Sequence, residues 1–158
     1  MNRTGIFVGI AVLVLAIAVV AGSMIIAPVL ADDDDDDVRV FTNESIKGRW
    51  GLSAQGMVLP PAVPVPTLAV AVGIVDFDGV GGCSITDTLN LGGTKIGPLT
   101  TKTCTYSVNS NGTGTLSFAF PDDPGPTPVS FVIVDNMREI IDIRTDQFAV
   151  AMGVLKRQ

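Results

Sequence analysis

Residues 68–91 read LAVAVGIVDFDGVGGCSITDTLNL, two β-type runs separated by a turn signal. The linker DGVGG at 78–82 can supply the positive φ angles that a tight connection requires. The run from Leu68 to Phe77 carries apolar side chains on both of its alternating faces, which predicts a strand covered on both sides. The stretch therefore predicts an antiparallel hairpin with one strongly apolar strand.

The same pattern continues through the chain after residue 46, where short β-type runs alternate with Gly-, Pro- and Asn-rich links and helical periodicity is absent. Because most links are short, sequence neighbours should pair antiparallel, and closing the sheet would bury its apolar face and remove its edges. We predict an all-β fold, a single eight-stranded antiparallel up-and-down β-barrel, with a two-sheet sandwich as the alternative. The predicted strands are 47–58, 68–78, 83–91, 99–108, 114–120, 129–134, 139–145 and 148–156.

Residues 1–31 have the features of an export signal. Arg3 precedes an apolar run at 6–20, Pro28 breaks the helix, and 29–31 supply small residues for a cleavage site. The alternative is an uncleaved membrane anchor, because residues 5–31 carry no charge and are long enough to span a bilayer. Both alternatives predict an exported protein, periplasmic or secreted, with tethering to the inner membrane if the segment is retained.

Six consecutive aspartates at 32–37 account for most of the acidity of the chain. We interpret residues 32–46 as an acidic disordered tail and lead-in, and residues 47–158 as the barrel domain. Without the aspartate run the folded part is nearly neutral. This argues against a nucleic-acid partner, because phosphate binding requires a concentrated basic face.

The chain contains no histidine and only two cysteines, Cys83 and Cys104. The absence of histidine excludes the usual Ser-His-Asp and Cys-His mechanisms and His-based zinc sites. No catalytic residue, metal or cofactor is assigned, and a non-enzymatic role is favoured. The cysteines flank a predicted hairpin centred on Gly93 and Thr94, which favours a structural disulfide. A redox-active pair would have the closer Cys-x-x-Cys spacing.

Three polar side chains are candidates for ligand binding. Asp87 has the same parity as Cys83, so an inward-facing strand would point its carboxylate into the barrel, where its pKa could shift. If the two cysteines are directly opposite, Lys102 lies diagonally across from Asp87 on the same face. The alternatives are a solvated Asp87 and, for Tyr106, a core aromatic with a satisfied hydroxyl.

Gly48-Arg49-Trp50 opens the first predicted strand. A Gly-x-Trp pattern at this point of an eight-stranded meander resembles the lipocalins and the wider calycin group. The resemblance implies that Trp50 closes the barrel floor under an arginine from near the last strand, Arg157 first and Arg144 second. The proline-rich link 59–66 lies where lipocalins carry the large loop over the cup mouth. The domain also resembles allene-oxide-cyclase-like barrels and small exported bacterial domains of unassigned function.

These observations predict an exported barrel that binds a small apolar or amphipathic ligand. The alternative is a structural envelope module that self-associates through Leu68 to Phe77. A cofactor-free isomerase or cyclase that uses Asp87, Lys102 and Tyr106 is a third and less favoured hypothesis. A membrane would be contacted only through residues 5–31, if they are not removed.

Overall fold

The computed structural model describes residues 39–158, so the predicted signal or anchor segment and the aspartate run lie outside the described residues. The described chain is all-β apart from two short 3₁₀ helices. Its elements are η1 (Asn43–Ile46), β1 (Gly48–Val58), β2 (Thr67–Phe77), β3 (Cys83–Leu91), β4 (Thr94–Thr100), β5 (Thr103–Val108), β6 (Thr113–Ala119), β7 (Thr127–Val134), η2 (Asp135–Met137), β8 (Glu139–Arg144) and β9 (Ala149–Arg157).

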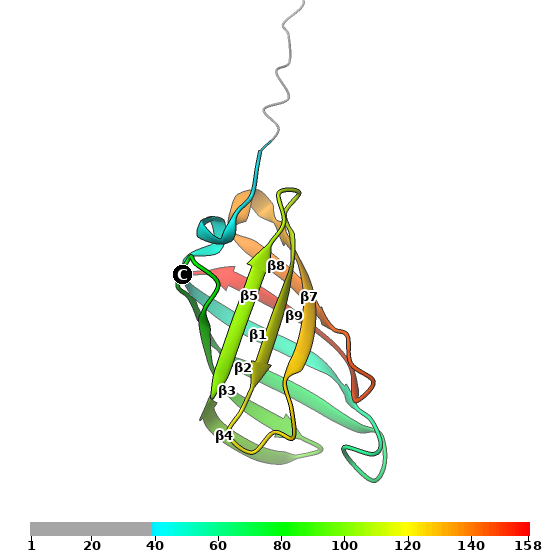
Figure 1. Cartoon of the computed structure of the whole chain (residues 1–158). Coiled ribbons are helices and arrows are strands. Elements are labelled where there is room, and N and C mark those ends of the chain that lie inside the picture. Colours follow the sequence, from blue (N-terminus) through cyan, green and yellow to red (C-terminus); the bar gives the residue numbers. More distant parts are fainter. Residues whose placement is uncertain (1–38) are drawn as a thin grey trace, which may run out of the picture. The chain divides into compact units, whose positions relative to one another are not determined.

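The strands form one antiparallel sheet in the order β4-β3-β2-β1-β9-β8-β7-β6-β5. The sheet curls around an apolar interior, with β5 and β7 facing β1, β2 and β9 across it (Figure 1). Apart from the β1–β9 pair, and the break between β4 and β5, sequence neighbours pair with each other. The predicted all-β, antiparallel meander is therefore confirmed.

The predicted closed eight-stranded barrel is wrong in strand number and in closure. The predicted strand 99–108 is divided at Thr101 and Lys102, and β4 begins earlier, because a turn at Gly92 and Gly93 returns the chain along β3. As a result β4 forms a ladder only with β3, and β5 forms a ladder only with β6. Within residues 39–158 the sheet is a curled half-barrel with β4 and β5 at its edges.

The two edges meet at one end of the sheet. Cys83 in β3 and Cys104 in β5 form the predicted disulfide, with their Cα atoms 4.9 Å apart. A single bridge pairs Gly82 with Thr105 beside it. The disulfide is confirmed, but it joins two edge regions of the curled sheet and not the two strands of one hairpin.

Trp50 fills the interior at this closed end. Its side chain is 0% exposed, its Nε1 donates to the Ile46 carbonyl at 2.8 Å, and its ring meets Phe77 edge-on. The Arg157 guanidinium lies 4.7 Å from the centroid of the Trp50 ring. The predicted contact between Trp50 and Arg157 is confirmed, and Arg157 also donates to the carbonyl of Ser45 at 2.7 Å.

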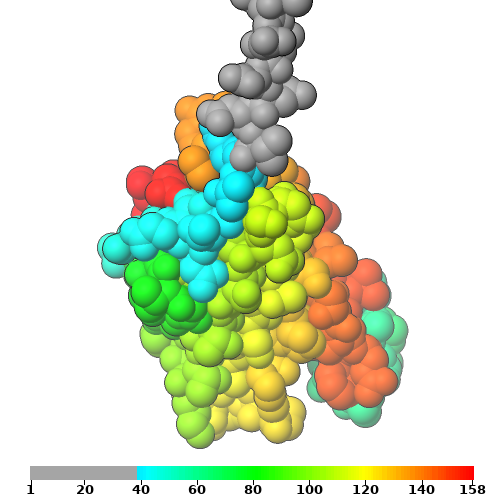
Figure 2. All heavy atoms as spheres, turned by 45° about the horizontal axis from the view of Figure 1, so that its top comes forward, coloured from blue at the N-terminus to red at the C-terminus, as the bar shows by residue number. Residues whose placement is uncertain are grey.

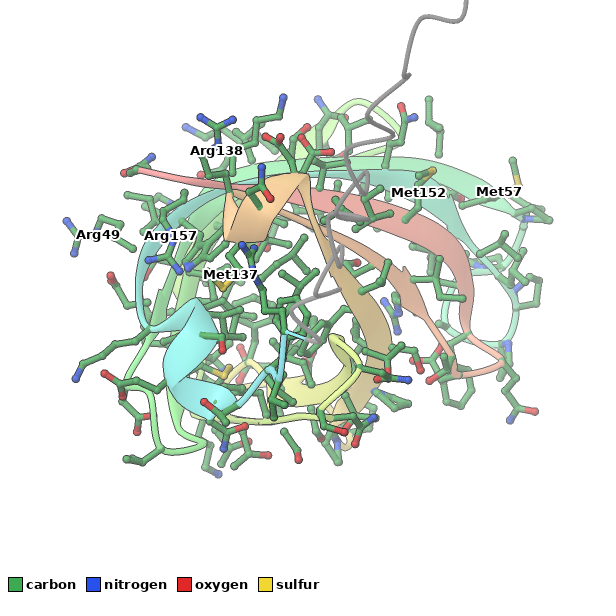
Figure 3. All side chains as sticks on the ribbon, turned by 90° about the horizontal axis from the view of Figure 1, so that it is seen from above. Arg49, Met57, Met137, Arg138, Met152 and Arg157 are labelled. Carbon is green, nitrogen blue, oxygen red and sulfur yellow. A yellow bond between two sulfur atoms is a disulfide. The ribbon has the colours of Figure 1, made fainter. Side chains whose placement is uncertain are left out.

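Figure 3 looks down on this closed end and shows Arg157 directed inward, whereas Arg49 and Arg138 point away from the domain. Arg144, the second candidate for the tryptophan contact, lies instead at the cavity described below. Gly48 precedes Trp50 with a φ of 113°, a conformation that side-chain-bearing residues rarely adopt. The glycine thus allows the bend by which the chain enters β1.

The folded domain begins before residue 47, so part of the predicted disordered lead-in is ordered. Ile46, at the end of η1, is 0% exposed, and Phe41 packs against the core. The Asn43 side chain accepts a hydrogen bond from the Val108 N–H at 2.8 Å. Ile46 and Phe41 thus extend the apolar core at the closed end, and Asn43 satisfies a backbone N–H of β5.

Candidate ligand-binding cavity

A cavity of about 940 Å³ occupies the half of the interior away from Trp50. Residues from the links 59–66, 120–126 and 145–148 line its open end. Figure 2 shows open space between the segment around residues 120–127 (yellow) and the lobe formed by the segments near 145–149 and 59–66. The remaining wall is mostly apolar.

The cavity exists because the inward-facing side chains become small toward the open end. On β2 the inward positions run from Phe77 and Val75 at the closed end to glycine and alanine, and β1 and β9 show the same taper. The small inward residues are Ala54, Gly56, Ala69, Ala71, Gly73, Ala149, Ala151 and Gly153. Three adjacent strands therefore leave space that larger side chains would fill.

Toward the open end, larger apolar side chains of these strands face outward. Leu68 and Val72 of β2 are 62% and 64% exposed, and Val150 of β9 is 70% exposed. The sequence pattern predicts Val150, Met152 and Val154 as one face of a strand, and the structure turns that face away from the interior. The β2 strand is thus apolar on both faces as predicted, but its outer face is not covered within the described chain.

Five carboxylates and one guanidinium contribute to the cavity lining, which is otherwise mostly apolar. They are Asp87, Asp122, Asp123, Asp142, Arg144 and Asp146. If all are ionised, the lining carries an excess of negative charge. The position of each group determines how that charge is balanced.

Asp142 is a half-buried carboxylate on the cavity wall. It lies on β8 opposite Gly153 of β9, and a Cβ added at Gly153 would lie 2.7 Å and 2.8 Å from its carboxylate oxygens. The glycine therefore provides the space that the carboxylate occupies. Burial raises the pKa of Asp142 to about 6, although a hydrogen bond from the Gly153 backbone acts in the opposite direction.

Asp87 has the same arrangement on the other side of β1. It lies on β3 opposite Gly73 of β2, and a Cβ added at Gly73 would lie 2.6 Å from the Asp87 Cβ. Burial, followed by the nearby charge of Asp123, raises the pKa of Asp87 to about 6. Within residues 39–158, neither Asp87 nor Asp142 forms a salt bridge.

Arg144 and Asp146 form a separate pair near the open end, with Nη2 and Oδ2 2.6 Å apart. Burial alone would raise the pKa of Asp146, but the hydrogen bonds from Arg144 and from the Phe148 N–H outweigh it and lower the pKa. The Arg144 Nε is buried and has no hydrogen-bond partner among the described residues. The single cation of the cavity is thus already matched by a carboxylate.

Of the three predicted ligand-binding residues, only Asp87 lines the cavity. Lys102 is exposed in the link between β4 and β5, because β3 pairs with β4 and not with a strand that includes Lys102. Tyr106 lies at the closed end, where its hydroxyl accepts from the Gly79 N–H at 2.9 Å and donates to the Asn43 carbonyl at 3.2 Å. Burial raises the pKa of Tyr106. The structure does not bring the three side chains together.

Asp142 is the site residue that sequence reasoning missed. In the run EIIDIR at 139–144, Ile141 and Ile143 would be expected inside and Asp142 outside. The structure has the opposite orientation, with Ile143 53% exposed and Asp142 against the cavity. The available signal was the glycine at position 153, which provides space for an inward carboxylate on the neighbouring strand.

No helix within residues 39–158 is long and apolar enough to cross a membrane. The described residues also contain no group of three or more His, Cys, Asp or Glu side chains placed to hold a metal ion. Comparison of the chain with models of known protein families and with curated proteins finds no match.

Proposed function

We propose that this protein binds a small apolar or amphipathic molecule in the cavity between its curled strands. The observation that carries the proposal is the cavity of about 940 Å³, whose wall is made largely of inward alanine, glycine and larger apolar side chains. Ligand sites are usually clefts of about 300–1,000 Å³, mostly apolar, with a few polar groups that orient the ligand.

Two further features support the proposal. The resemblance of Gly48-x-Trp50 to lipocalins suggests a cup that is closed at one end and open at the other. The disulfide between Cys83 and Cys104 is compatible with the oxidising compartment that the predicted export of the chain implies. A periplasmic or secreted carrier of a poorly soluble molecule is consistent with both features.

The test is the binding of the neutral apolar dye N-phenyl-1-naphthylamine, measured by its fluorescence. In the double variant Ala71→Leu/Ala151→Leu, two larger side chains enter the cavity from β2 and β9, and we expect at least tenfold weaker dye binding. The matched control is Val72→Leu, which changes an outward side chain of β2 that is 64% exposed. Equal dye binding by the double variant, the control and the parent protein would exclude the cavity as the binding site.

A second candidate function is self-association, supported by the apolar outer face of β2, β1, β9 and β8. Leu68, Met57 and Val150 lie in one row across three strands, and Val70, Gln55 and Met152 lie in the next. Figure 3 shows Met57 and Met152 on the same outer side of the domain. The outward residues of the neighbouring β3 are serine, threonine and asparagine, so the apolar patch is one-sided. We define this patch as the outer apolar face.

A second copy of the chain is the partner that the outer apolar face fits best. The two rows of residues named above contain no charged side chain, and a two-fold contact would pack the outer apolar face of one copy against the same face of the other. Sedimentation velocity at micromolar concentrations should then show a dimer. Val72→Lys combined with Val150→Lys should give monomers, whereas Thr86→Lys, on the polar outer surface of β3, should not. A parent protein that remains monomeric throughout this concentration range would contradict self-association.

A further inference from the structure

We propose that the cavity ligand is a cationic amphiphile, a molecule with an apolar body and a protonated amine that the negative charges of Asp87 and Asp142 attract to the inner end of the cavity. This inference rests on the proposed ligand-binding function and names the chemical class of the ligand.

The charge balance of the cavity is the first argument. Arg144 is the one cationic side chain in the lining, and Asp146 holds it at 2.6 Å. Asp87 and Asp142 therefore face an apolar space without a counter-charge from the described residues. Both carboxylates are half-buried. Partial burial of a carboxylate without a counter-charge is costly, and a cation from the ligand would offset that cost.

The placement of the two carboxylates is the second argument. They belong to β3 and β8, which are separated in the sheet by β2, β1 and β9, so they approach the cavity from different parts of the wall. Through the register, Asp87 is level with Leu52 of β1 and Asp142 is level with Ala54. Both therefore lie at the depth where the small inward residues give way to the packed closed end.

This depth gives the ligand an orientation. An ammonium group near Asp87 and Asp142 would lie at the inner end of the cavity. The apolar body would then extend along the alanine-lined wall toward Val58, Phe120 and Phe148 at the open end. A cavity with negative charge at its inner end would bind a cationic amphiphile more tightly than uncharged or anionic analogues with the same apolar body.

An anionic ligand is disfavoured by the same arrangement. The unpaired Nε of Arg144 could donate to an acceptor, but the charge of the guanidinium is already matched by Asp146. The other charged groups that line the cavity are Asp122 and Asp123, which add further negative charge. A fatty acid carboxylate would thus enter a lining in which carboxylates outnumber the guanidinium.

The experiment compares dodecylamine, dodecan-1-ol and dodecanoate as competitors of N-phenyl-1-naphthylamine. Each is used below its micelle concentration or solubility limit, at about pH 8, where carboxylates of the kind described are ionised. The three probes share one alkyl chain and differ only in the head group. We expect dodecylamine to bind at least tenfold tighter than dodecan-1-ol, and dodecanoate to bind most weakly. This comparison uses the parent protein and therefore does not depend on the folding of any variant.

Variants then assign the selectivity to the two carboxylates. Asp87→Asn and Asp142→Asn should each weaken dodecylamine binding about tenfold and leave dodecan-1-ol binding unchanged. Asp76→Asn is the matched control, because Asp76 is paired with Arg49 on the outer surface. Equal binding of the three probes, or a preference for dodecanoate, would overturn the proposal and leave ligand binding itself intact. Failure of every probe and of the dye to bind would overturn both.

Discussion

The two halves of the interior are built from the same strands but in opposite ways. At the closed end β1, β2 and β9 point Trp50, Phe77 and Leu155 inward, and these side chains are at most 4% exposed. Toward the open end the same strands point alanine and glycine inward and surround a cavity of about 940 Å³. One half is filled and cross-linked, and the other is hollow and carries unpaired carboxylates.

The difference shows how a single sheet can separate the packing that stabilises it from a cavity that is a candidate binding site. The closed end concentrates the disulfide, the edge-on aromatic pairs and the Arg157 contact. The hollow half has less apolar packing, and its half-buried Asp142 and Asp87 oppose folding when they are ionised. Substitutions in the two halves should therefore change stability in opposite directions.

The largest effect is expected from Trp50→Ala at the closed end. The variant removes a fully buried side chain and its hydrogen bond to Ile46, and we expect the free energy of unfolding to fall by about 3–5 kcal/mol. Urea titration followed by far-UV circular dichroism measures the change. A loss below about 1 kcal/mol would mean that the closed end does not depend on the packing of Trp50.

The next effect is expected from Cys83→Ser/Cys104→Ser, which removes the link between the two edge regions. The disulfide closes a sequence separation of 21 residues, for which the chain-entropy model gives about 3 kcal/mol. Reduction of the parent protein with dithiothreitol should reproduce the loss measured for the variant. Equal stability with and without the bond would show that Gly82, Thr105 and their neighbours hold the edges together unaided.

Asp142→Asn tests the hollow half and should raise stability. The folded-state pKa of Asp142 is about 6, above its ordinary value of 3.8. The folded state therefore binds the proton more tightly, and the parent loses stability as the pH rises through about 4 to 6. Near pH 8 the variant should be more stable than the parent by ~2 kcal/mol, and the difference should vanish below about pH 4.

Thermal and urea unfolding at both pH values measure this difference. Asp76→Asn, whose carboxylate pairs with Arg49 on the outer surface, should show no gain near neutral pH. A destabilised Asp142→Asn variant near pH 8 would contradict a half-buried carboxylate that forms no salt bridge.

The smallest effect is expected from Arg157→Gln. This change removes the cation from the Trp50 ring and the hydrogen bonds to the carbonyls of Ser45 and Lys47. We expect a loss of about 1 kcal/mol in the free energy of unfolding. Arg49→Gln, at an exposed ion pair, should have no measurable effect. Equal effects of the two substitutions would show that the guanidinium over Trp50 acts as an ordinary surface charge.

The strands with strong turn signals at both ends could be predicted from the sequence. The strand 83–91 was predicted with its observed bounds, because the DGVGG linker precedes it and Gly92-Gly93 follows it. At the closed end, the contact between Trp50 and Arg157 was predicted from the resemblance of Gly48-x-Trp50 to lipocalins, and the disulfide from the two cysteines of the chain. No strand was predicted over residues 94–98, where Gly97 and Pro98 interrupt the β-type run, although an edge strand tolerates a proline.

The hollow half could be predicted only in part. Alternation shows which side chains share a face, but it does not show which face is inside when both are apolar. On β8 the face with Ile140 and Asp142 turns inward, although the opposite face carries two isoleucines, so Asp142 was not identified. Asp87 was identified because its parity matched Cys83, whose position was constrained by the disulfide. In both cases a glycine on the neighbouring strand lies opposite the inward aspartate. This pairing indicates an inward carboxylate, which the alternation of apolar and polar residues alone does not.

Both ends of the described chain lie at the closed end of the domain. The backbone N–H of Phe41 donates to Ser110 beside one closed-end turn, and that of Gln158 donates to Arg49 at the start of β1. In Figure 1 the C-terminus and η1 lie at the opposite end from the links that border the cavity. A tether or a fused protein at either end would therefore leave the mouth free. The domain could therefore be immobilised through its termini in the proposed binding experiments without blocking the mouth of the cavity.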